Sequence, residues 1–251
     1  MPQLPTFGGE EIIWAGGPLN TGKLVLLPGA APKPKDEAHA TVILRGDGSL
    51  RLRGLQGEDH IYLEARPSAH TGSILWIGGN GRAGDVVLLP ASATSRDSKQ
   101  ATIHLNGATG DITLQNADCA EDFDVTDRTE VEPGTVMVID DSGSLRPSAE
   151  AYDKRVVGVV SGAGTARPAI VLDRRPAESV RAPVALVGKV FCKADARTSS
   201  IAVGDLLTTS GTPGHAMKAV DPTKAFGAVL GKAMDSLADG ADLIPVLVAL
   251  Q

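Results

Sequence analysis

Short runs in which apolar and polar residues alternate dominate the first half of the chain. Leu50–Arg53 (LRLR) and Ile112–Gln115 (ITLQ) are two of these runs. Alternation of this kind is typical of a strand with one buried face. Glycine-containing joints such as 46–48 and 78–81 separate the runs, and glycine suits tight turns because it tolerates positive φ. Because no segment of helix length shows a clear 3.6-residue period, the pattern predicts an all-β fold.

The first half also repeats itself, and corresponding segments lie 61 or 62 positions apart. The paired segments are 12–17 (IIWAGG) with 74–79 (ILWIGG), 22–28 with 84–90, 40–46 with 101–107, and 48–52 with 110–114. Register held over this length indicates a duplicated β unit. We therefore expect residues 1–116 to form a shaft-like domain, a β-prism or β-helix, from copies at about 10–55 and 72–115.

The second half repeats more loosely. The clearest pair is Pro133–Val138 with Val203–Thr208. Two copies of one β unit, at about 131–172 and 201–250, predict a C-terminal domain over 133–251 that is a β-barrel or sandwich with an internal pseudo-two-fold. Only 232–238 and 147–152 have a briefly helical pattern.

The joint between the halves is acidic. Seven acidic residues lie between Asp118 and Glu132, with Arg128 as the one basic residue among them. A charged segment with few strand signals is a natural domain boundary. We therefore interpret 117–132 as an acidic junction.

Composition and charge exclude several classes of function. The formal net charge is −6 and no basic patch stands out, so we expect no nucleic-acid partner. No apolar run approaches the ~20 residues that cross a bilayer, so no membrane insertion is expected. The first residues, MPQLPTFGGEE, lack the features of a signal peptide, which predicts synthesis in the cytoplasm. Two cysteines without motif spacing predict neither a disulfide framework nor a metal site, and we expect no cofactor.

Three aspartates in the acidic junction are weak metal candidates. Asp122, Asp124 and Asp127 could offer oxygen ligands to Ca²⁺. The segment lacks the glycine and the later glutamate of a helix–loop–helix calcium site. We therefore favour a solvated acidic stretch.

Both tryptophans occupy equivalent positions of the first repeat. Trp14 and Trp76 each precede a glycine-containing turn. An aromatic ring at such a place can stack on a sugar or pack at a contact between subunits. The repetition favours a core or subunit contact, and sugar binding stays the alternative.

Several segments of the second half form one recognisable series. It begins at Asn116–Phe123 (NADCAEDF), continues through Val131–Val136 and Asp153–Ser161, and resumes in Val203–Gly214 (VGDLLTTSGTPG). Through these segments, residues 116–251 resemble the C-terminal domains of phage tail fibres and related appendage proteins. Some members of this family are homotrimers, so the resemblance implies a trimeric structural protein.

In some members of the family the C-terminal domain is an intramolecular chaperone that cuts itself off. Self-cleavage requires a nucleophile and an acid or base. The groups that this chain offers near the junction are Cys119, Glu121, Asp122 and Ser161. Autoproteolysis is thus an alternative that the resemblance implies, and we otherwise expect no enzyme activity.

The physical pattern also favours association. The runs Leu24–Leu27 and Val86–Leu89 do not alternate strictly, so both faces of these strands need cover. Two repeat copies are too few to stack into a stable solenoid, for which about three are usually needed. We expect a trimeric fibre- or spike-like component of a phage tail or related injection particle, located in a virion or extracellular particle. Its C-terminal half would promote trimerisation or contact a receptor; a self-cleaving chaperone and a carbohydrate-binding adhesin are the alternatives.

Overall fold

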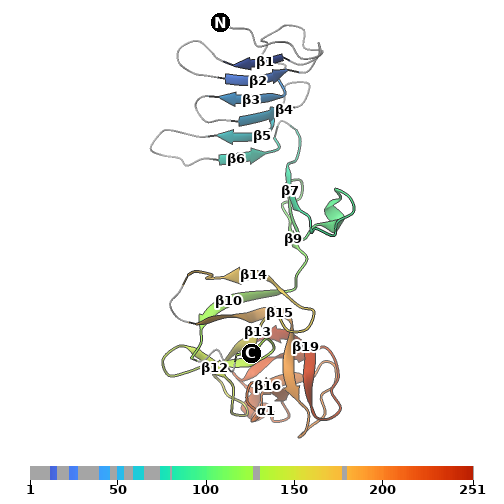
Figure 1. The fold of residues 1–251 in the computed structure, drawn as a ribbon. Coiled ribbons are helices and arrows are strands. Elements are labelled where there is room, and N and C mark those ends of the chain that lie inside the picture. Colours follow the sequence, from blue (N-terminus) through green and yellow to red (C-terminus); the bar gives the residue numbers. More distant parts are fainter. Residues whose placement is uncertain are drawn as a thin grey trace. The chain divides into compact units, whose positions relative to one another are not determined.

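The chain folds into two compact units, 1–113 and 114–251, in a computed structural model (Figure 1). The residues described are 12–15, 23–27, 40–45, 50–53, 59–64, 74–79, 81–126, 131–176 and 180–250. They are nearly all β, which agrees with the all-β expectation. None of the helices in these ranges is long and apolar enough to cross a membrane.

The first unit contains a six-stranded antiparallel sheet whose strands follow one another in chain order (Figure 1). Its strands are β1 (Ile12–Ala15), β2 (Lys23–Leu27), β3 (Val42–Arg45), β4 (Leu50–Arg53), β5 (Asp59–Glu64) and β6 (Ile74–Ile77). Neighbouring strands are joined by local connections, so each pair forms from residues close in sequence. The alternating run Leu50–Arg53 of the sequence forms β4.

A second, three-stranded sheet of the first unit consists of β7 (Asp85–Leu88), β8 (Ile103–Asn106) and β9 (Ile112–Leu114). The turn from β8 to β9 is fixed by Asn106, whose Oδ1 accepts hydrogen bonds from the backbone N–H groups of Ala108 and Thr109 at 2.9 and 3.2 Å. Gly110 completes the turn with φ of 80°. A side-chain amide that replaces a turn hydrogen bond is a common way to close such a loop.

The strand pair β7·β8 of the second repeat copy joins the residues that are equivalent to those joined by β2·β3 in the first copy. Lys23 lies opposite Arg45 in the first pair, and Asp85 lies opposite Asn106 in the second. Close backbone approach constrains the second pair further. A side chain on Gly107 would collide with the carbonyl oxygen of Gly84 at 2.1 Å. Glycine is required there for packing rather than for a turn.

The second unit is built around a closed barrel. Its strands are β10 (Asp118–Asp124), β11 (Val136–Ile139), β12 (Leu145–Pro147), β13 (Val156–Val160), β14 (Pro168–Leu172), β15 (Arg181–Asp195), β16 (Leu206–Thr209), β17 (Ala216–Lys218), β18 (Val229–Ala233) and β19 (Ala241–Ala249), with one short helix, α1 (Pro222–Ala225). Strands β15, β17, β16, β18 and β19 close the ring, because β15 pairs with both β17 and β19. Buried residues of these strands, including Val190, Leu207 and Val246, fill its core. This agrees with the expected barrel.

The long strand β15 joins the barrel to the rest of the unit. Its first part pairs with β10 and β13, and its second part pairs with β19 (Figure 1). Gly188 lies at the change of partner with φ of 110°. A Cβ atom there would be 2.7 Å from the carbonyl oxygen of Ala117 and 3.0 Å from Cα of Asp118. Only glycine fits this crossing without strain.

Two three-stranded units within the second half have the same order of pairing. β11 pairs with β12 and β13, and β16 pairs with β17 and β18, antiparallel in all four cases. A register shift falls after Met137 in one unit and after Leu207 in the other. The pseudo-two-fold that the sequence predicts remains a prediction for the whole half, but these pairings have the pattern that it requires.

Two details differ from the sequence analysis. Residues 118–124 of the acidic junction form β10, which pairs with β14 and β15, so the expectation of few strands is wrong for this segment. Its alternate residues Asp118, Ala120 and Asp122 are buried. The helical pattern at 232–238 is also wrong, since β18 covers its start and Leu237 forms a bridge with Ile201. The helical pattern at 147–152 is wrong as well, because this stretch holds the last residue of β12 and a turn.

Candidate assembly surface

The register of the six-stranded sheet places aliphatic residues in rows on one face. Opposite partners share a face in antiparallel sheets, and residues two apart on a strand share it as well. The rows run across β2 to β6 through Leu26, Val42, Leu52, Ile61 and Ile77, and beside them through Leu44, Leu50 and Leu75. We call these eight residues the aliphatic strip.

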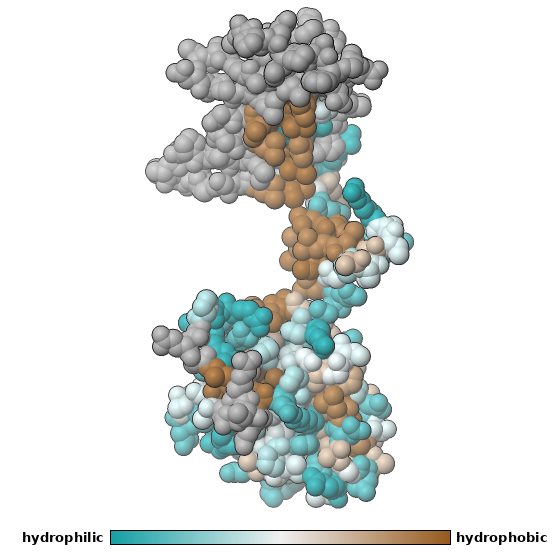
Figure 2. All heavy atoms as spheres, viewed as in Figure 1, coloured by the Kyte–Doolittle hydropathy of each residue, from teal (hydrophilic) through white to brown (hydrophobic). Residues whose placement is uncertain are grey.

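The aliphatic strip is open to solvent within one chain. Leu26, Leu44 and Leu75 are 36%, 45% and 53% exposed, and the other five residues are half-buried. By contrast, Val25 and Ile43 on the opposite face are fully buried. Figure 2 shows hydrophobic side chains gathered on the visible part of this sheet. Contiguous exposed apolar faces are typical of interaction surfaces, which makes this face a candidate for one.

The three-stranded sheet repeats this arrangement. Leu88 and Leu105 point to one face and are 51% and 41% exposed. The other face carries a polar pair: Nε2 of His104 lies 3.0 Å from Oδ2 of Asp85, and this contact lowers the pKa of the Asp85 carboxyl. Leu88 and Leu105 occupy the same repeat positions as Leu26 and Leu44. Both copies therefore present an uncovered aliphatic face.

Trp76 lies on the face opposite the aliphatic strip. It stands between Leu75 and Ile77 on β6, so its side chain points the other way, and it is 51% exposed. The backbone of Trp14 is the register partner of Val25. The Trp14 side chain lies outside the described residues.

The four groups available for self-cleavage are not gathered in one arrangement. Ser161 Oγ donates a hydrogen bond of 2.8 Å to Oδ2 of Asp118, a residue that the sequence analysis did not select. Cys119 and Glu121 alternate with Asp118 and Asp122 along β10 and are half-buried. No hydrogen bond among the described residues joins Ser161 to Cys119, Glu121 or Asp122.

The buried carboxyl of Asp118 is incompletely paired. It is 2% exposed, and its Oδ1 has no hydrogen-bond partner. Burial raises its pKa, and the hydrogen bond from Ser161 opposes this effect. In the sequence, Asp118 is one of several acidic residues in the junction. Its burial beside Ser161, which is 43 residues away, is not visible in the local pattern.

The metal candidates are partners of arginines. Oδ2 of Asp122 accepts a hydrogen bond from Nε of Arg174 at 3.1 Å, and Oδ1 of Asp124 lies 3.3 Å from Nε of Arg181. Asp127 lies outside the described residues. Within the described part of the chain, no group of three or more His, Cys, Asp or Glu side chains is placed to hold a metal ion. The arginines are about 50 residues away in sequence, which is why spacing alone did not reveal these pairs.

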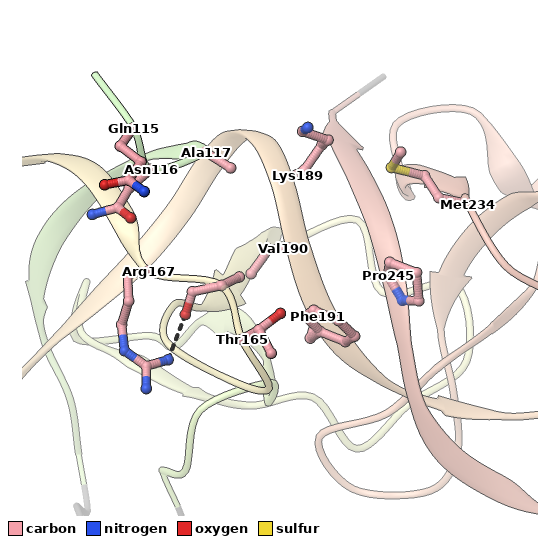
Figure 3. A pocket seen from close by; sticks show the side chains of 11 residues that line it. Gln115, Asn116, Ala117, Thr165, Arg167, Lys189, Val190, Phe191, Met234 and Pro245 are labelled. Carbon is pink, nitrogen blue, oxygen red and sulfur yellow. Dashed lines mark hydrogen bonds between the residues drawn. The ribbon is translucent and has the colours of Figure 1, made fainter. Parts of the chain in front are cut away.

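A pocket of about 280 Å³ opens on the barrel beside Phe191, Met234 and Pro245 (Figure 3). Its one arginine, Arg167, is engaged by the loop that carries it. Nη1 of Arg167 donates to the carbonyl oxygens of Gly162, Gly164 and Ala166, at 2.9, 3.3 and 2.6 Å. This side chain organises the loop, and the pocket presents mainly an apolar wall.

Comparison with known protein families and with curated proteins finds no match. Among solved structures, the chain is similar to the pre-mature gene product 12 of bacteriophage phi29. The sequences are 14% identical, the TM-score is 0.38, and the similarity covers 60% of this chain and 25% of that one.

Proposed function

We propose that this chain is a non-enzymatic structural protein: a trimeric, fibre- or spike-like component of a phage tail or related injection particle. The observation that carries the proposal is the aliphatic strip, which a second and third copy would cover. The resemblance of residues 116–251 to tail-fibre C-terminal domains supports the kind of particle. The face of β7 and β8 that carries Asp85 and His104 is then the outer surface.

Strand length favours three copies around an axis. The strands of the six-stranded sheet have four to six residues. At about 3.3 Å per residue they are about 13–20 Å long. If one strand from each of three copies forms a side of a triangle, each strand backbone lies about 4–6 Å from the central axis. Packed sheets lie ~10 Å apart, so half of that spacing is close to this distance. Leucine and isoleucine side chains would fill the centre, and the exposed sheet faces would disappear.

A smaller apolar row supports a role of the C-terminal half in trimerisation. Ile170, Cys119 and Val187 are register partners across β14, β10 and β15. Ile170 and Val187 are 43% and 54% exposed. Strand β14 pairs only with β10 among the described strands, so its other edge is open to a neighbour.

A pair of adjacent substitutions tests the proposal. Leu75 and Trp76 are neighbours on β6 with nearly equal exposure, 53% and 51%, but lie on opposite faces. Leu75→Asp places a charge in the proposed interior and is expected to break the trimer, whereas Trp76→Asp is expected to keep it. The masses of both variants are measured by light scattering at micromolar concentration.

The outcome that contradicts the proposal is equally defined. If Leu75→Asp keeps the mass of the wild type, or if both substitutions dissociate it alike, the strip is not the interface.

The carbohydrate-binding alternative is favoured by the exposed ring of Trp76. It predicts binding on a glycan array that Trp76→Ala removes and Leu75→Ala retains.

A further inference from the structure

A second cavity, of about 490 Å³, lies between the two three-stranded units of the second half. Thr135 enters it from the start of β11, Arg146 and Ser148 from β12 and its end, and Lys193 from β15. Gly214, in the loop between β16 and β17, closes the wall. Backbone hydrogen bonds fix this loop, because Gly214 donates to the Ser148 carbonyl at 2.7 Å and accepts from the Val136 N–H at 2.9 Å.

Two of the residues that line the cavity carry buried hydroxyl groups. Thr135 and Ser148 are 1% and 0% exposed. Neither Thr135 Oγ1 nor Ser148 Oγ has a hydrogen-bond partner among the described residues. Buried polar groups are nearly always paired, with protein, water or a ligand. Two unpaired hydroxyls in one wall indicate that a polar guest belongs there.

Two cations face the same cavity and retain donor capacity. Arg146 donates from Nη1 to the Pro147 carbonyl at 3.2 Å, and its Nη2 is 3.9 Å from Oδ2 of Asp153. Asp153 is held more closely by Arg155, at 3.2 Å. Nζ of Lys193 lies 3.0 Å from Oε2 of Glu132, a side chain that is 72% exposed. An exposed partner is a weak competitor, so both cations can pair with an anion.

The equivalent corner of the other three-stranded unit is closed by its own side chains. Gly134 and Gly204 occupy equivalent turns with φ of 91° and 89°. The residue after Gly204 is Asp205, whose Oδ2 lies 2.8 Å from Lys218 Nζ and accepts from the Ala202 N–H at 2.7 Å. In the first unit the corresponding residue is Thr135, with no such partner. Of these two equivalent corners, the one at Thr135 is therefore the one with an unpaired hydrogen-bonding group.

We propose that this cavity binds an acidic saccharide unit, a sugar that carries a carboxylate or a phosphate group. Arg146 and Lys193 hold the acidic group, and the hydroxyls of Thr135 and Ser148 hydrogen-bond the sugar oxygens. Pro147 and Pro213 supply apolar surface for the ring. The volume lies in the usual range of ligand pockets. The choice of a surface saccharide rests on the proposed role in receptor contact, whereas the acidic and polar chemistry rests on the cavity alone.

Isothermal titration calorimetry on the full chain tests the site with four probes: glucuronate, glucose 6-phosphate, glucose and inorganic phosphate. Saturable binding is expected for at least one of the two acidic sugars and not for glucose. Lys193→Gln or Arg146→Gln is expected to raise Kd about tenfold or more, because each removes a charge-assisted hydrogen bond. The exposed Lys154, outside the cavity, provides the control Lys154→Gln, which keeps the wild-type Kd.

Ser148→Ala separates a binding role from a structural one. It is expected to weaken binding while raising Tm of the free protein, because it removes an unpaired buried hydroxyl. A lower Tm, or wild-type affinity in all three cavity variants, would overturn the proposal. So would the absence of saturable heat with both acidic sugars. Inorganic phosphate binding as tightly as glucose 6-phosphate would overturn the saccharide part. Light scattering on the same samples reports assembly separately, so failure of this site leaves the trimer proposal standing.

Discussion

Asp118 and Asp195 are both buried, but their pKa values are shifted in opposite directions. Both are nearly inaccessible, at 2% and 6% exposed. Asp118 has one hydrogen bond and an unpaired oxygen, whereas Asp195 accepts from Nε and Nη2 of Arg197 at 2.9 and 2.7 Å. Burial raises the pKa of the first, and the arginine lowers the pKa of the second.

Asp118→Asn is expected to stabilise the protein at neutral pH. Because the folded-state pKa of Asp118 lies above its unfolded value, the wild type is penalised as pH rises through the range between those values. The variant's advantage should therefore be present at pH 7 and shrink toward pH 4. Urea unfolding at a series of pH values measures it. A variant that is less stable than the wild type at pH 7 would contradict this assignment.

Asp195→Asn is expected to have the opposite effect. The lowered pKa means that Asp195 contributes stability above its unfolded pKa and that this stability is lost as pH falls through the folded one. Loss of the paired hydrogen bonds from Arg197 should cost about 2 kcal/mol at pH 7. The deficit should diminish in acid. Thermal unfolding at neutral and acid pH measures it, and a deficit that is equal at all pH values would show that charge is not involved.

Residues whose roles depend on partners far away in the chain were the hardest to foresee. The segment of β10 showed few strand signals, and two of its three buried positions, Asp118 and Asp122, are aspartates. Their burial depends on Ser161, which is 43 residues from Asp118, and on Arg174. Nothing in the local pattern reports such partners. The role of the candidate residues near the junction therefore stays a prediction.

At the scale of elements, local pattern predicted most of the strands. Runs such as Leu50–Arg53 became strands with the expected bounds, because their pairing partners are adjacent in sequence. The helical pattern at 232–238 failed because pairing of β18 with β16 and β19 outweighs weak local preference. The ring closure of β15 with β19 joins segments far apart, and the sequence predicted a barrel or sandwich without deciding between them.

The crossing at Gly188 provides a test of the long strand β15. Gly188→Ala is expected to destabilise the protein by about 2–3 kcal/mol, since it combines backbone strain with a collision against Ala117 and Asp118. Gly204→Ala is the matched control, because its φ is 89° but nothing lies within 4 Å of the added atom. It should show only the strain, about 1 kcal/mol. Equal losses in chemical unfolding would show that the crossing is not tightly packed.

At the scale of the whole molecule, the two sheets of the first unit present aliphatic faces and the second unit has a closed core. A single chain leaves the strip uncovered, although Val25 and Ile43 beneath it are fully buried. Sequence alone predicted the need for cover from the runs around Leu24 and Val86. The sequence did not show which face of the sheet is uncovered, because that depends on the register of neighbouring strands.

The mass of the wild-type chain in solution tests the central claim most directly. Size-exclusion chromatography with multi-angle light scattering, at micromolar concentration and moderate salt, measures it without any label. The account predicts a single species with the mass of three chains of 25.8 kDa, insensitive to salt because the interface is apolar. A stable species with the mass of one chain would contradict it.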